Sequence, residues 1–202
     1  MAIAYQATAA SVVSEFRVVL ADTFDSNNNN WYVESADDEY ARTTYSIEDG
    51  IYRWDSTAHQ GFIGWVTADT SLLGDFYMSL EASQVIGSNS AHYGVVFREY
   101  DNSNFYYFGI NDKWQYTVLI LYAEEWITLT DWTRTELINS SKPNRITVIG
   151  QGSRFIFFIN DQYLAELTDD RIKTGSVGLA INIARPDQRA VFEFDNVELR
   201  AP

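Results

Sequence analysis

Cysteine is missing from this 202-residue sequence, and proline occurs only three times. Without cysteine the chain can form no disulfide, no thiolate metal site and no cysteine nucleophile. Positive charge is also scarce, because 14 Lys and Arg residues stand against 28 Asp and Glu, a formal net charge of −14. A surface of this sign repels phosphate backbones and anionic lipid headgroups, so we expect no binding to nucleic acid or to membrane surfaces.

Long apolar runs are absent as well. No stretch of the sequence approaches the roughly 20 apolar residues of a membrane span. The first residues also lack the basic start and the long apolar stretch of a signal peptide. We expect residues 1–15 to be a linker or an added tail, and residues 16–202 to form one domain, since this length fits a single β-sandwich.

Short strands are the dominant local signal. Residues 75–84 alternate between apolar Phe76, Met78 and Leu80 and polar neighbours, the period of two that indicates a sheet with one buried face. About fourteen such runs follow one another at regular spacing, joined by turn sequences such as Asn160-Asp161. This pattern predicts an all-β fold of two antiparallel sheets packed face to face.

Seven motifs follow one another along most of the chain. They are LADTFDSNNNNW (Leu20–Trp31), GIYRW (Gly50–Trp54), GDFYMSLEA (Gly74–Ala82), YGVVFREYDNSNFYYFGI (Tyr93–Ile110), NRITVIGQGSRFIFFINDQYLAEL (Asn144–Leu167), GSVGLAI (Gly175–Ile181) and FDNVEL (Phe194–Leu199). In this order they resemble the concanavalin-A-like lectin and glucanase superfamily, and most of all the laminin-G-like and 3-keto-disaccharide-hydrolase-like accessory domains of bacterial surface proteins. The resemblance implies a jelly-roll fold, an extracellular or cell-surface location and no required cofactor.

The last strand carries two carboxylates that could serve catalysis. The spacing E-x-D-x-x-E from Glu193 through Asp195 to Glu198 resembles the catalytic strand of laminarinase-type glucanases, where one Glu is the nucleophile and the other the acid/base. Alternation places Glu193 and Asp195 on one face, and Glu198 joins them only if a bulge shifts the phase. Because the motif also lies at the end of the chain, we interpret it as a closing strand with a solvated acidic edge.

Calcium is a second possibility, because jelly-roll modules often hold one ion where the first and last strands meet. Carboxylate and carbonyl oxygens are the ligands that Ca²⁺ prefers. Asp22, Asp25, Asp195 and Asn196 could supply them, so the resemblance implies a possible structural calcium site at these residues.

The outward face of the central strands is the third candidate. Alternation over 91–100 and 104–111 places Tyr93, Val95 and Phe97 toward the core, and a register error of one residue would exchange the two faces. Aromatic rings with Arg and Asn suit sugars, since rings cover apolar C–H faces and polar groups reach hydroxyls. The predicted ligand-binding residues are His92, Arg98, Tyr107, Asn111, Trp114 and Trp126.

From these features we expect a non-catalytic recognition module that binds carbohydrate. Two alternatives remain open at this point. A structural domain could use exposed aromatic strands to contact copies of itself or a neighbouring protein domain. A glycoside hydrolase would use Glu193 and Glu198 as its acid and nucleophile.

Overall fold

The computed structural model describes residues 11–88 and 90–202, which contain fifteen strands. Fourteen of them correspond to the predicted runs, and the three-residue β2 is an addition. The strands are β1 (Arg17–Asp22), β2 (Ser35–Asp37), β3 (Ala41–Glu48), β4 (Ile51–Ala58), β5 (Phe62–Thr67), β6 (Phe76–Ile86), β7 (His92–Asp101), β8 (Asn104–Asn111), β9 (Gln115–Tyr122), β10 (Glu125–Arg134), β11 (Asn144–Gln151), β12 (Arg154–Ile159), β13 (Gln162–Thr168), β14 (Ser176–Ile183) and β15 (Arg189–Ala201).

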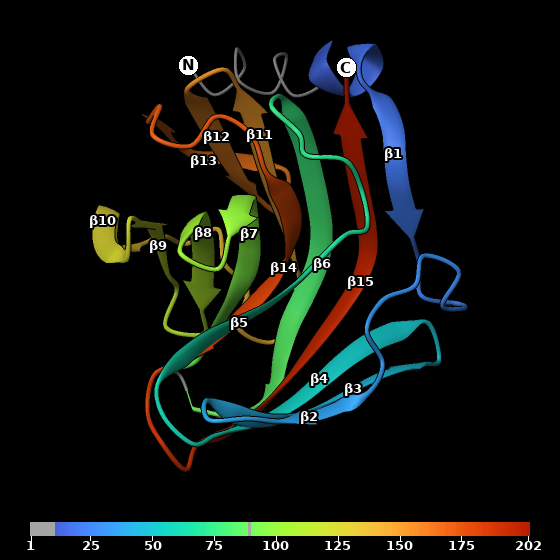
Figure 1. Ribbon diagram of the computed structural model, residues 1–202, viewed down its shortest axis with the longest axis vertical. Coiled ribbons are helices and arrows are strands. Elements are labelled where there is room, and N and C mark those ends of the chain that lie inside the picture. Colours follow the sequence, from blue (N-terminus) through green and yellow to red (C-terminus); the bar gives the residue numbers. More distant parts are fainter. Residues whose placement is uncertain (1–10, 89) are drawn as a thin grey trace.

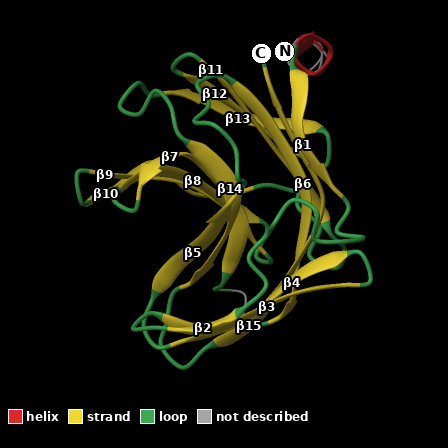
Figure 2. Ribbon diagram, turned by 45° about the vertical axis from the view of Figure 1, so that its right-hand side comes forward, coloured by secondary structure: helices red, strands yellow, loops and turns green. Residues whose placement is uncertain are grey.

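Two antiparallel sheets form the sandwich (Figure 1). The larger sheet has nine strands in the order β13-β12-β11-β6-β15-β4-β3-β2, with β1 also pairing with β15. The smaller sheet has six strands in the order β10-β9-β8-β7-β14-β5. Figure 2 shows β9 and β10 turned away from β5, which lies close to β2 and β3. The predicted all-β, two-sheet jelly roll is confirmed.

The main core lies between the sheets, and the predicted alternation fills it. Phe76, Met78 and Leu80 of β6 point into it and have no exposed surface. From the smaller sheet, Val95 and Phe97 of β7 face them, as expected. Burying one side chain of this size stabilises the fold by about 1.5–3 kcal/mol, so a core of this extent needs no disulfide.

A second apolar layer covers the outer face of the six-stranded sheet. Val96, Phe105, Tyr107 and Ala180 are completely buried there, and the partly buried Ile63, Trp65, Leu119 and Leu121 pack against them. Both faces of this sheet are therefore apolar at its centre. Alternation usually indicates a polar outward face, but the described residues at the centre of this sheet present apolar side chains outward instead.

The amino-terminal segment also contacts the sandwich. Residues 11–15 form a helical turn, and Val12 is buried against Tyr77, Ile149, Ile156 and Phe158 on the outer face of the nine-stranded sheet. Residues 1–10 of the expected linker lie outside the described residues. No helix in the described ranges is long and apolar enough to cross a membrane.

Candidate functional site

A groove of about 570 Å³ lies between the outer face of the six-stranded sheet and the segment that carries β2 and the start of β3. This volume falls within the usual range of small-ligand sites, roughly 300–1,000 Å³. The groove is lined by Ala36, Asp38, Tyr40, Ala41, Thr43, Tyr45, Gly61, Phe62, Ile63, Gly64, Trp65, Asn102, Phe105, Leu121 and Trp126.

Three aromatic rings in contact form one wall of the groove. The ring centroids of Trp65 and Phe105 are 4.6 Å apart, and those of Phe105 and Trp126 are 5.5 Å apart in an edge-to-face arrangement. The register explains the contact, because Leu121 of β9 lies opposite both Phe105 and Trp126, and opposed residues share a face. Trp126 is 51% exposed, so an apolar ring is available to a ligand at this wall.

The opposite wall is a loop held in place by its own hydrogen bonds. Asp38 Oδ1 accepts the backbone N–H groups of Tyr40 at 2.8 Å and Ala41 at 2.9 Å, and the Tyr40 carbonyl accepts the N–H of His59 at 2.8 Å. His59 Nε2 also lies 2.8 Å from Asp37 Oδ1. These bonds hold Tyr40, which is 48% exposed, at the edge of the groove.

Polar groups are placed between the two walls. Burial raises the pKa of the Tyr45 hydroxyl, and the nearby negative charge of Asp38 adds to the effect. Tyr45 therefore stays neutral and can donate a hydrogen bond at physiological pH. Together with Asn102 it gives the groove a hydroxyl and an amide group beside aromatic faces, the combination that binds sugars in proteins.

Arg98 does not lie on the outer face, contrary to the prediction. It has φ 49° at a β-bulge, where the pairing of β7 with both neighbouring strands shifts register. The bulge turns the side chain inward, so that its guanidinium lies 4.7 Å from the centroid of the Phe155 ring and only 1% of the residue is exposed. A ligand cannot reach Arg98.

Three other predicted ligand residues are also covered. Tyr107 is on the predicted face but has no exposed surface. Asn111 is buried and its Oδ1 accepts the N–H groups of Lys113 and Gln115, which shapes a turn. His92 packs edge-on against Trp132 with centroids 4.5 Å apart, and burial lowers its pKa to about 4, so it is neutral at pH 7.

The two predicted tryptophans have different positions. Trp126 lines the groove. Trp114 is 40% exposed but does not line it, and the Arg134 guanidinium lies over its ring at 5.3 Å. Two groove residues, Tyr40 and Trp65, were not predicted, and they come from segments outside residues 91–126. Tyr40 lies in a loop just before β3, and Trp65 lies in β5, whose residues are all partly buried, so neither has an alternating pattern that marks it as a ligand residue.

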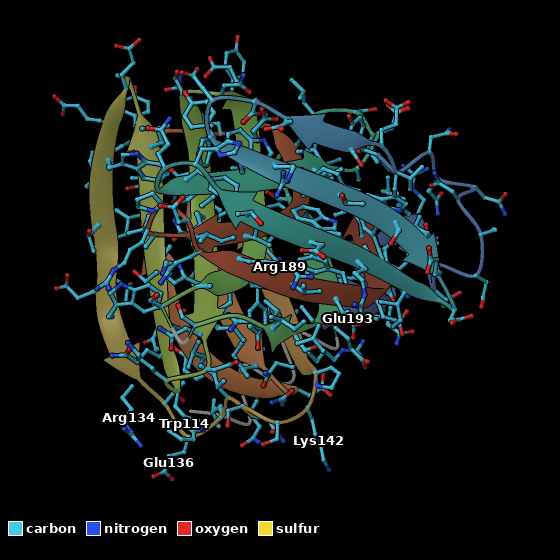
Figure 3. All side chains as sticks on the ribbon, turned by 90° about the horizontal axis from the view of Figure 1, so that it is seen from below. Trp114, Arg134, Glu136, Lys142, Arg189 and Glu193 are labelled. Atoms are coloured by element: carbon cyan, nitrogen blue, oxygen red, sulfur yellow. The ribbon has the colours of Figure 1, made fainter. Side chains whose placement is uncertain are left out.

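Glu193 and Glu198 do share a face, because Asn196 forms a bulge with φ 50° and the register shifts between Asp195 and Glu198. That face is the outer surface of the nine-stranded sheet, away from the groove. Arg53 pairs with Glu193, and Arg200 pairs with Glu198. Figure 3 shows Glu193 and Arg189 well separated from Trp114 and Arg134.

The residues expected to bind calcium make hydrogen bonds within the protein. Asp22 Oδ1 accepts the N–H of Phe24 at 2.7 Å, and its Oδ2 accepts the indole N–H of Trp31 at 2.7 Å. Asp195 Oδ1 accepts the backbone N–H of Asn196 at 2.6 Å, and its Oδ2 accepts the side-chain amide of Asn196 at 3.0 Å. Within residues 11–88 and 90–202, no three His, Asp or Glu side chains are grouped so that they could hold a metal ion.

We therefore expect chelation to leave thermal stability unchanged. Melting curves with and without EDTA should superimpose, since the described residues contain no group of three His, Asp or Glu side chains placed to hold an ion. An ion that binds only the folded state raises the melting temperature. A fall of about 5 °C in EDTA that calcium chloride reverses, and that Asp22→Asn abolishes, would contradict this expectation and support the site at Asp22, Asp25, Asp195 and Asn196.

No family model and no curated protein matches the sequence. Solved structures with the same fold do match over most of the chain. The carbohydrate-binding module CBM66 of Bacillus subtilis is 18% identical, with a TM-score of 0.55, and the match covers 92% of this chain and 95% of that one.

Two further matches have higher TM-scores and lower identities. A protein of unknown function with a galectin-like fold from Bacillus subtilis is 12% identical, with a TM-score of 0.62 and coverage of 92% and 97%. A β-glucanase of Bacillus licheniformis is 8% identical, with a TM-score of 0.61 and coverage of 91% and 97%. The chain thus has the same two-sheet jelly-roll fold as these proteins.

Proposed function

We propose that this domain is a non-catalytic carbohydrate-binding module of an extracellular or cell-surface protein, with its ligand in the groove. The observation that carries the proposal is a cavity of sugar size lined by Tyr40, Trp65 and Trp126, in which the buried Phe105 ring contacts both tryptophans. Aromatic faces cover the C–H surfaces of pyranose rings, while hydroxyl and amide groups bind the sugar hydroxyls. The printed name of one structural neighbour, a carbohydrate-binding module, supports the same function.

The positions of the carboxylates support a binding role over hydrolysis. A retaining glycosidase needs two carboxyl groups about 5–5.5 Å apart on either side of the scissile bond. Glu193 and Glu198 are each paired with an arginine and lie outside the groove. Asp38 is the one carboxylate among the described residues that line the groove, so the second carboxyl group of such a pair is missing from this lining.

Replacing Trp126 with alanine should weaken oligosaccharide binding by roughly tenfold or more, because the most exposed aromatic ring of this wall is lost. Isothermal titration with a panel of oligosaccharides measures the effect. Trp114→Ala is the matched control, since Trp114 has a similar exposure outside the groove. We expect that variant to bind like the unchanged protein, and neither protein to release reducing ends from the same sugars.

Other results would contradict the proposal. Equal binding by Trp126→Ala, or a loss confined to Trp114→Ala, would place the site elsewhere. Release of reducing ends that Glu193→Gln abolishes would make the protein a glycoside hydrolase. If the panel gives no binding and light scattering shows mass rising with concentration, self-association replaces carbohydrate binding as the function.

A further inference from the structure

The charge of the groove comes from one carboxylate. Among the described residues that line it, Asp38 is the only side chain charged at neutral pH. Both backbone donors to this carboxylate bind Oδ1, which leaves Oδ2 without a hydrogen-bond donor among the described residues. Asp38 is exposed, so a ligand can reach the free oxygen.

The surroundings of Asp38 also favour a positive charge. Tyr40, Trp65 and Trp126 present aromatic rings to the same groove, and the face of an aromatic ring attracts cations. The lining contains no Lys or Arg that would pair with Asp38 from within the described part of the groove. The net charge of −14 adds an attractive long-range field for cations and a repulsive one for anions.

We propose that the groove selects glycans with protonated amino groups, such as chains of glucosamine, over the same chains with acetylated amines. This inference rests on the proposed carbohydrate-binding function and names the ligand class of that site. The ammonium group would donate to Asp38 Oδ2, while the sugar rings would pack on Trp65 and Trp126. The ammonium and carboxylate groups also attract each other as opposite charges, an attraction that the neutral acetamido group of the acetylated chain lacks. Glycans that carry carboxylate or sulfate groups should bind worse than neutral chains.

Isothermal titration with a β-1,4-linked glucosamine oligomer and its N-acetylated counterpart of equal length tests the proposal. We expect the amine form to bind about tenfold more tightly at low salt. The preference should shrink as sodium chloride is added, whereas binding of the acetylated form should change little.

Asp38→Asn is the decisive variant, because asparagine can keep both backbone hydrogen bonds through Oδ1 and removes only the charge. It should bind both oligomers with similar affinity. Asp161→Asn is the matched control, since it removes one carboxylate from the turn between β12 and β13, at the other edge of the nine-stranded sheet. That variant should keep the full preference.

The possible failures are distinguishable. If the acetylated oligomer or another neutral chain binds and the amine form binds no better, the amine proposal is wrong and the carbohydrate-binding function stands. If Asp38→Asn still prefers the amine form, the preference comes from the overall charge of the protein, and the role of Asp38 is overturned. If Asp38→Asn melts early, the salt dependence of the unchanged protein decides the question. Absence of binding to every sugar overturns both proposals.

Discussion

Arg98→Ala should lower the free energy of unfolding by about 3–5 kcal/mol. The Arg98 guanidinium donates to the backbone carbonyls of Ile172 at 2.9 Å and Gly74 at 3.0 Å, and also to the carbonyl of Gly152. Loss of the side chain would leave these carbonyls without their donor, at about 1–3 kcal/mol for each one that stays buried. Equilibrium unfolding in urea measures the change.

Two further variants test whether the hydrogen bonds of the guanidinium cause this loss of stability. Arg98→Lys should recover only part of the lost stability, because a single ammonium cannot match the planar fork of the guanidinium. Arg154→Ala is the control on the surface, where its side chain pairs with Glu166, and it should cost about 1 kcal/mol or less. A loss below about 1 kcal/mol for Arg98→Ala would show that this side chain is not the buried link between the three segments.

Tyr107→Ala should be comparably destabilising, by about 3–5 kcal/mol, because a completely buried aromatic ring is removed from the second apolar layer. Tyr107→Phe separates the ring from the hydroxyl. The Tyr107 hydroxyl is buried without a hydrogen-bond partner in the described structure, so its removal should leave stability unchanged or slightly raised.

Thermal and chemical denaturation of both Tyr107 variants gives the answer. A small effect of Tyr107→Ala on stability, together with weaker sugar binding, would restore Tyr107 to the ligand surface. A strongly destabilising Tyr107→Phe would instead reveal a hydrogen bond made by the hydroxyl. The first result would contradict the buried position of the ring, and the second would contradict the absence of a partner for the hydroxyl.

Much of the fold could be predicted because strand alternation reports directly on burial. Tyr93, Val95 and Phe97 face the core as their spacing indicated. Alternation fails at bulges, since one extra residue moves every later side chain to the other face. The bulge at Arg98 turned a predicted surface cation into a buried one, and the bulge at Asn196 brought Glu198 to the face of Glu193.

The covered position of Tyr107 had a different cause. Its ring lies over Gly109, where a Cβ atom would fall 2.4 Å from the Tyr107 hydroxyl oxygen. A residue can thus face away from the main core and still be buried beneath neighbours from other strands. The candidate site could not be predicted for a similar reason, because Tyr40, Trp65 and Trp126 come from separate strands and loops. Their proximity depends on how β5 approaches β3, which no local pattern encodes.

The six tryptophans provide the most direct test of the groove as the carbohydrate site. In a ¹⁵N-labelled sample each indole N–H gives its own NMR signal, and titration with a bound oligosaccharide shows which ones move. Trp65 and Trp126 line the groove, Trp31 and Trp54 are buried in the core, and Trp114 and Trp132 are exposed outside it. We predict that the signals of Trp65 and Trp126 shift with the ligand while the other four stay in place. Shifts confined to Trp114 or Trp132, with Trp65 and Trp126 unmoved, would contradict the account.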